Sequence, residues 1–214
     1  MSAGADFDWT HCYPPGVEPT WEVALLFPPQ GGWTVEEYFE LSERTNLLVE
    51  YTKGRIEVLE MPTFEHQRIV MYLAILFREL GIDPEMGYAL IAPHQTTILP
   101  EVIREPDIVF KLRENMGSPD EKYFVGADLV MEVVSADKKS HHRDYETKVQ
   151  DYAAAEIPEY WIVDPQEQKI TVLALDGHKY AEHCVAGPGE SATSKLLEGL
   201  TVDASAVFES GKKR

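Results

Sequence analysis

Two acidic residues occur in segments that otherwise resemble buried strands. Asp107 directly precedes the apolar residues of the run "REPDIVF", and Glu132 lies in the middle of "DLVMEVVS". Successive side chains of a strand point to opposite faces, so Glu132 shares a face with Val130 and Val134. Burying an ionised carboxylate is costly unless it is paired, hydrogen-bonded or bound to a metal. Both acids are therefore candidates for chemistry.

The spacing of the two acids is compatible with one shared metal ion. Asp107 and Glu132 are 25 residues apart, which leaves room for a loop over 112–127 that returns the chain to an adjacent strand. Adjacent strands lie about 4.8 Å apart, close enough for both carboxylates to bind one divalent cation. Oxygen ligands with free water positions suit Mg²⁺ or Mn²⁺, and we expect one of these ions here.

Lys148 is a third candidate. It follows Tyr145 by three residues and precedes Tyr152 by four in a helix predicted over "DYETKVQDYAAAE", so it borders the apolar stripe. We expect it to reach towards Glu132, where a cation can orient or help to deprotonate a metal-bound water, or contact a phosphate. Two alternatives stay open: a structural Glu132–Lys148 ion pair, and a lysine that extends along the helix to solvent. Asp107 alone could equally cap a turn or a strand.

The charge of the chain restricts how it could bind nucleic acid. Its 19 basic and 37 acidic residues give a net charge of −18, which repels polyanions at long range. Binding would need a bound metal or a local basic patch. The run "KKSHHR", predicted as a loop, supplies such a patch through Lys138, Lys139 and Arg143, and Arg104 is a weaker candidate. The alternative for this run is an ordinary solvated loop.

The order of predicted elements indicates one α+β (mixed α/β) domain over residues 34–208, after an N-terminal arm (1–33) that docks at least in part and before a flexible tail (209–214). Helices are expected from Thr34, where Glu37 completes a capping box, and from Thr63 to Gly81. Strands are expected in a hairpin that turns at Lys53-Gly54, at 88–99, 106–111 and 128–134, and in the pair "EYWIVDP" and "KITVLAL".

Composition also bears on location. The two cysteines, Cys12 and Cys184, are far apart and share no metal-like spacing, which fits a reducing cytosol better than a disulfide framework. The first residues lack the charged and apolar regions of a signal peptide. No apolar run approaches the roughly 20 residues of a membrane span. We therefore expect a cytoplasmic protein without a membrane partner.

The chain resembles the Uma family of restriction-endonuclease-like proteins, a branch of the PD-(D/E)XK nuclease superfamily. The similarity covers about residues 34–208, and its most specific part is the run "RDYETKVQDYAAAEIPEYWIVDP". The other matching segments are "VEYTKGRIEVLEMP", "EHQRIV", "REPDIVF", "DLVMEVVS" and "KITVLAL". The resemblance implies a central mixed β-sheet flanked by helices, metal-dependent cleavage of nucleic acid with DNA as the expected substrate, and a homodimer.

The same resemblance assigns roles by position. Asp107 and Glu132 become the metal-binding pair, Glu50 a further ligand directly or through water, and the Val133 carbonyl a possible additional ligand. The chain departs from the superfamily at Val134, where the name-giving lysine would stand, and Lys148 is the expected replacement.

His66 and Gln67 match the "HQ" of the family at the start of the long helix, where exposed amides and the helix dipole favour a phosphate. Helix capping or a hydrogen bond to Glu50 is the alternative role for the two residues.

Two other functions are compatible with the sequence. A non-catalytic binding module that keeps the nuclease fold would bind DNA or protein without cleavage, and the net acidity and Val134 favour it. The joint presence of Glu50, Asp107, Glu132 and Lys148 favours an enzyme, since a decayed site loses some of its members. A metalloenzyme acting on a small phosphorylated substrate would leave oligonucleotides intact.

Overall fold

A computed structural model describes residues 27–80, 82–117 and 122–212. Most of the expected arm, residues 1–26, and the expected helix stop at Gly81 lie outside the described residues. Residues 27–33 contact the first hairpin: the amides of Gly31 and Trp33 both donate to the Gly54 carbonyl, at 2.7 and 3.1 Å.

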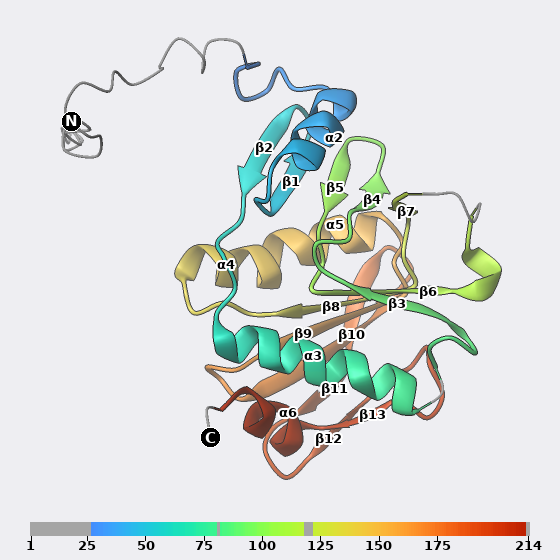
Figure 1. The fold of residues 1–214 in the computed structure, drawn as a ribbon. Helices are drawn as coiled ribbons and strands as arrows, with labels where there is room; N and C mark the ends of the chain where they lie inside the picture. Colours follow the sequence, from blue (N-terminus) through green and yellow to red (C-terminus); the bar gives the residue numbers. More distant parts are fainter. Residues whose placement is uncertain (1–26, 81, 118–121, 213–214) are drawn as a thin grey trace, which may run out of the picture.

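The first sheet has five strands in the order β2-β1-β5-β4-β7 and carries helix α2 (Figure 1). Their bounds are α2 (Val35–Arg44), β1 (Val49–Thr52), β2 (Arg55–Val58), β4 (Thr96–Leu99), β5 (Val102–Arg104) and β7 (Phe124–Val125). The capping box of Thr34 and Glu37 is confirmed. The hairpin turn is confirmed as well, because Lys53 and Gly54 both have positive φ, 45° and 78°, as a two-residue turn between twisted strands requires.

The second sheet has six strands in the order β11-β10-β9-β8-β6-β3. Their bounds are β3 (Gly87–Ile91), β6 (Ile108–Leu112), β8 (Leu129–Val133), β9 (Glu159–Asp164), β10 (Lys169–Asp176) and β11 (Lys179–Ala186). Strand β8 is central, as predicted, with β6 antiparallel on one side and β9 parallel on the other. The strand expected at 88–99 is wrong: it is split into β3 and β4, which belong to different sheets, on either side of Pro93. Proline lacks the N–H that a continuing ladder needs.

Helices cover both faces of the six-stranded sheet (Figure 1). On one face, Leu129, Met131 and Val133 share a core with residues of α3 (Phe64–Glu79) and α6 (Ala204–Gly211). On the other face, Val130 and Val134 pack with α5 (Lys148–Ala154). Thr63 caps α3 as predicted. Helix α6 continues past the expected end of the domain at residue 208.

The helix that supplies Lys148 begins earlier than the sequence indicated. Helix α4 (Lys138–His142), the π-helical turn η3 (Arg143–Thr147) and α5 follow one another without a break. The "KKSHHR" run is therefore helical, and its prediction as a loop is wrong. Asp137 explains the early start, because its side chain accepts a hydrogen bond from the Ser140 amide at 2.8 Å and caps α4.

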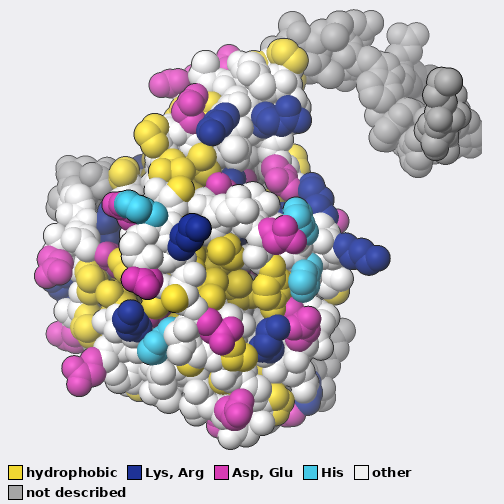
Figure 2. Space-filling model, turned by 180° about the vertical axis from the view of Figure 1, so that it is seen from behind, with side chains coloured by type: hydrophobic (Ala, Val, Ile, Leu, Met, Phe, Trp, Pro, Cys, Tyr) yellow, Lys and Arg dark blue, Asp and Glu magenta, His cyan; other side chains and the backbone are white. Residues whose placement is uncertain are grey.

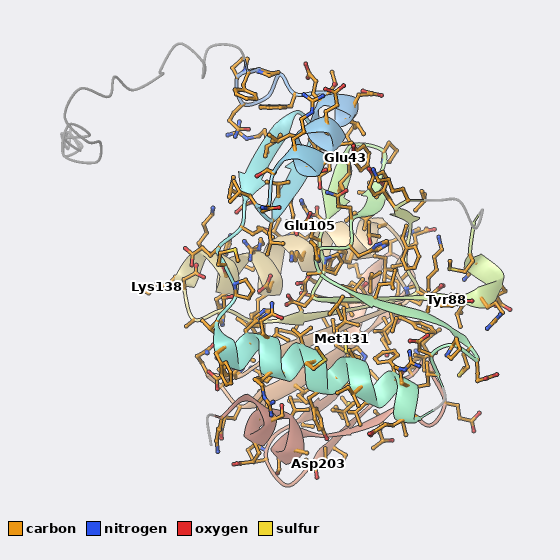
Figure 3. All side chains as sticks on the ribbon, viewed as in Figure 1. Glu43, Tyr88, Glu105, Met131, Lys138 and Asp203 are labelled. Carbon is orange, nitrogen blue, oxygen red and sulfur yellow. The ribbon has the colours of Figure 1, made fainter. Side chains whose placement is uncertain are left out.

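The remaining elements are short: η2 (Arg113–Asn115), β12 (Ser191–Thr193) and β13 (Thr201–Asp203). No helix among the described residues is long and apolar enough to cross a membrane. Figure 3 shows Met131 in the middle of the six-stranded sheet and Glu105 between the two sheets, where the candidate site lies.

Candidate active site

Asp107 and Glu132 lie opposite each other on neighbouring strands. The antiparallel register pairs Ile108 with Met131, which places Asp107 opposite Glu132 just beyond the last paired residues. Residues opposite each other in an antiparallel pair share a face, and here that face carries α5. Both side chains line one small cavity of about 50 Å³. The expected convergence of the two acids is therefore present in the structure.

One oxygen of Asp107 is held by the protein. Asp107 Oδ2 accepts a hydrogen bond from the Val133 amide at 2.7 Å and lies 3.1 Å from His66 Nε2. Among the described residues, Oδ1 has no hydrogen-bond partner. His66 is only 8% exposed, so its ring orients Asp107; neither of the alternatives considered for it, capping or a bond to Glu50, applies to that ring.

Glu132 is held in a similar way. Its Oε1 accepts a hydrogen bond from the Tyr152 hydroxyl at 2.7 Å and lies 2.7 Å from Lys148 Nζ. Within the described part of the chain, these partners leave Oε2 without a hydrogen bond. The expected contact between Lys148 and Glu132 is therefore present, and the lysine does not extend to solvent: only 2% of its side chain is exposed.

Glu50 faces Lys148 rather than the cavity. Its Oε1 lies 3.5 Å from Lys148 Nζ and accepts a hydrogen bond from the Glu105 amide, while its Oε2 lies 3.5 Å from Arg104. The residues that line the cavity include Lys148 but not Glu50. This geometry favours a role for Glu50 in anchoring Lys148, and its expected role as a metal ligand stays a prediction.

Arg104 does not form part of a surface for nucleic acid. It is 5% exposed, and its guanidinium contacts Asp151 at 2.5 Å, Thr52 Oγ1 at 2.8 Å and Glu50. An arginine with these buried partners cannot reach a phosphate without breaking its ion pairs. The expectation that Arg104 binds nucleic acid is therefore corrected: it neutralises Glu50.

Asp144 is a site residue that the sequence interpretation missed. It is 3% exposed, lines the cavity, and its Oδ1 lies 3.7 Å from Lys148 Nζ and 3.6 Å from Arg143 Nε. That oxygen makes no hydrogen bond within the described residues. The available signal was its position four residues before Lys148 in "RDYETK", a spacing that places two side chains on one helix face.

Burial and like charges set the proton affinities of the cluster. Burial raises the pKa of Glu132 to about 7 against the attraction of Lys148, and Asp107, Asp144 and Glu50 raise it further. Burial also raises the pKa of Asp144. For Glu50, burial is outweighed by Lys148, Arg104 and Arg143, so its pKa is lowered.

Lys148 and His66 both favour their charged forms. Burial acts to lower the pKa of Lys148, but Glu132, Glu50 and Asp144 together raise it well above its ordinary value. Burial likewise acts to lower the pKa of His66, but the hydrogen bond to Asp107 and its charge raise it. Lys148 therefore stays an ammonium ion at neutral pH and acts through its charge, so deprotonation of a water by Lys148 is not favoured.

Besides His66, two of the expected nucleic-acid contacts line the cavity, and two lie on the surface of α4. Gln67 is exposed and lines it together with the half-buried Arg143. Lys138 and Lys139 are exposed on α4, with Lys138 at the outer end of that helix in Figure 3. Figure 2 shows basic and histidine side chains, interspersed with acidic ones, along the right-hand edge, where a half turn from Figure 1 brings α4.

A second group with metal-ligand atoms is less suited to an ion. The ligand atoms of His141, Asp164 and Glu167 all lie within 4.8 Å of one another. Asp164 Oδ1 already accepts the amides of Gln166 and Glu167, and its Oδ2 accepts the Tyr145 hydroxyl. Because these oxygens already accept hydrogen bonds within the protein, Asp164 stabilises the turn that follows β9 and its contact with Tyr145 of η3.

The Asp107–Glu132 site does fit a divalent ion. Each of these carboxylates has one oxygen fixed by the protein and one without a hydrogen bond among the described residues, and both line the same cavity. Oxygen donors of this kind suit Mg²⁺ or Mn²⁺.

Comparison with known proteins connects this site to a family. The model of the Uma2 family, described as "Putative restriction endonuclease", matches residues 35–205. A solved structure of a putative nuclease belonging to DUF820 from Anabaena variabilis ATCC 29413 matches with a TM-score of 0.68 and 16% sequence identity, over 84% of this chain and 99% of that chain. No curated protein matches. The structural likeness confirms the expected fold class, a mixed α/β fold with helices around mixed sheets.

Proposed function

Because the chain belongs to the Uma2 family of restriction-endonuclease-like proteins, we propose that it is a nuclease that uses Mg²⁺ or Mn²⁺ to hydrolyse phosphodiester bonds, with DNA as the substrate. The observation that carries this proposal is that Asp107 and Glu132 lie opposite each other on neighbouring strands and line one cavity. The Lys148 ammonium lies 2.7 Å from Glu132.

Asp107 and Glu132 are the residues that would hold the ion, with the Val133 carbonyl as a further ligand. When bound, such an ion supplies Lewis acidity: it polarises a phosphate and lowers the pKa of a coordinated water. His66 and the Val133 amide fix the orientation of Asp107, and Tyr152 and Lys148 fix that of Glu132. Partners of this kind orient metal ligands and tune their affinity.

Lys148 acts as a fixed positive charge. Its ammonium is held among Glu50, Glu132 and Asp144, so its position costs little reorganisation during the reaction. A cation placed in advance stabilises the negative charge that develops on a phosphate in the transition state. Gln67, on the exposed first turn of α3, is the donor that we expect to contact a neighbouring phosphate.

A non-catalytic nuclease-fold module is the second candidate, and one observation favours it. Glu132 Oε1 is already saturated by Lys148 and Tyr152, as expected for a structural ion pair. The two functions predict different results when Asp107 is replaced. Because Asp107 makes no contact with Lys148 among the described residues, its replacement tests the metal site without removing a partner of Lys148.

Plasmid nicking tests the proposal. Supercoiled DNA is incubated with purified protein in Mg²⁺, in Mn²⁺ or in EDTA, and the Asp107→Asn variant is purified in parallel. We expect nicking that requires the ion and falls at least about 100-fold in the variant, the usual scale for losing a key electrostatic group. Equal nicking by the variant would reveal a contaminating nuclease, and DNA binding without nicking by the wild type would favour the binding module.

We further propose that the active form is a cytoplasmic homodimer, since enzymes that cut both strands commonly pair two identical sites, and two-fold symmetric dimers are the commonest oligomers. Light scattering after size exclusion tests the assembly.

A further inference from the structure

A groove lies between the first hairpin and helix α4. We name it the hairpin groove; it has a volume of about 490 Å³ and is lined by Gln30, Thr52, Arg55, Ile56, Glu57, Val58 and Lys139. Arg55 and Lys139 are exposed. Within the described residues, the Arg55 side chain makes no hydrogen bond or ion pair, so its guanidinium is available to a ligand.

Glu57 is the single acid among the described residues that line this groove, and its position in the hairpin is unusual. It pairs directly with Glu50 across strands β1 and β2, so two carboxylates share one face, an arrangement that is destabilising unless cations intervene. Glu50 is neutralised by Lys148 and Arg104. Glu57 is neutralised by a different pair of cations, both from the α4–η3 helix.

These two cations connect the hairpin groove to the candidate active site. Glu57 Oε1 lies 2.8 Å from Lys139 Nζ and 3.6 Å from an Arg143 guanidinium nitrogen. Lys139 lines the groove, and Arg143 lines the cavity of Asp107 and Glu132. A single carboxylate oxygen is therefore held between a cation of the groove and a cation of the site, in the way a phosphate oxygen would be.

We propose that the hairpin groove binds the phosphate backbone of the nucleic-acid strand next to the cleavage position, and that Glu57 occupies a phosphate position in the free protein. This inference rests on the proposed nuclease function. On binding, a backbone phosphate replaces Glu57 between Lys139 and Arg143, and Arg55 contacts the adjoining phosphate.

Several features favour a polyanionic backbone as the occupant. The Lys139 side chain is 76% exposed and that of Glu57 is 37% exposed, and ion pairs at such exposed positions are weak, so they exchange readily. Among the described residues that line the groove, the cations Arg55 and Lys139 outnumber the single acid Glu57, in a chain whose net charge is −18. A local excess of positive charge in an acidic protein is what sequence-independent contact with phosphates requires.

The test is DNA affinity measured as a function of salt. A fluorescently labelled duplex of about two helical turns is titrated with protein in Ca²⁺ and, separately, in EDTA. Glu57→Gln is expected to tighten binding about two- to fivefold, because the competing carboxylate is removed. Arg55→Ala and Lys139→Ala are each expected to weaken binding and to reduce the slope of log affinity against log salt by about 1.

Glu182→Gln is the matched control, because this exposed residue of β11 gives the same change in net charge outside the groove. If Glu57→Gln binds DNA no better than Glu182→Gln, or if Arg55→Ala keeps the wild-type salt slope, the inference is wrong. Wild-type protein that binds no duplex would also overturn it. Groove-dependent binding without metal-dependent nicking would instead preserve the groove as a phosphate-binding surface and refute the proposed nuclease function.

Discussion

Lys148 Nζ lies 2.7 Å from Glu132 Oε1, and both side chains are almost fully buried. Glu50 and Asp144 lie within 3.5 and 3.7 Å of the same ammonium, so one cation serves three carboxylates. The arrangement neutralises the buried acids, and in the proposed nuclease it would keep a positive charge beside the scissile phosphate.

Removal of Lys148 should therefore destabilise the fold. Lys148→Met leaves three buried carboxylates without their shared cation, and loss of one partner of a buried pair typically costs about 3–5 kcal/mol. Glu132→Gln in the same chain should recover part of that loss. Urea unfolding of the two single variants and the double variant measures the coupling. Strictly additive losses would mean that the 2.7 Å contact contributes nothing to stability.

The stability of the metal-free protein should fall as the pH rises through neutrality. Burial raises the folded-state pKa of Glu132 to about 7, so the folded chain holds this proton more tightly than the unfolded chain. The resulting stabilisation is complete below the unfolded pKa, near 4.5, and is lost as the pH rises through about 7.

Glu105, whose pKa burial also raises to about 7, acts in the same direction, so the informative quantity is the difference between the wild type and Glu132→Gln. Urea unfolding in EDTA at pH 5, 6, 7 and 8, from about two units below this pKa to about one unit above it, should show a steeper loss for the wild type. Parallel curves would contradict the assigned shift.

His66 and Gln67 should have separate effects although they are neighbours. His66 orients Asp107 at 3.1 Å, so His66→Ala should weaken Mn²⁺ binding about 10- to 100-fold, as loss of a ligand-orienting partner does. Gln67 is exposed at the cavity, so Gln67→Ala should weaken DNA binding and leave Mn²⁺ affinity unchanged. Titrations of both variants with Mn²⁺ and, separately, with DNA distinguish the two roles; identical profiles would refute this division.

Replacement of Asp144 by asparagine should lower activity without lowering stability. Because burial raises its pKa, its ionised form is disfavoured by folding, and Asp144→Asn should leave thermal stability unchanged or raise it at pH 8. The same change should lower nicking, because Lys148 and Arg143 lose a carboxylate that holds them. A variant with reduced stability and wild-type nicking would assign Asp144 a purely structural role. Loss of activity with unchanged or increased stability is typical of substitutions at functional residues.

Local patterns in the sequence predicted the central strand and its two acids. Alternation in "DLVMEVVS" indicated a strand buried on both faces, and the 25-residue spacing left room for a return loop. Both features depend on residues close in sequence, and the structure bears them out: β8 is fully buried and Asp107 lies opposite Glu132.

The contacts that the sequence did not indicate join distant segments. Arg104 resembled a surface cation, but its partners Glu50 and Asp151 are 54 and 47 residues away. His66 matched a phosphate-binding position, but its partner Asp107 is 41 residues away. By contrast, the start of α4 was marked locally by Asp137, a helix-capping residue that the sequence interpretation did not use.

The most direct test of the central claim is Mn²⁺ titration by calorimetry on the wild type and Asp107→Ala. Asp107 takes no part in the Lys148 ion pairs, so the variant should keep its fold, which thermal unfolding checks. We predict one saturable Mn²⁺ site in the wild type and its loss in the variant. Equal binding by both proteins, or no binding by either, would contradict a metal site at Asp107 and Glu132.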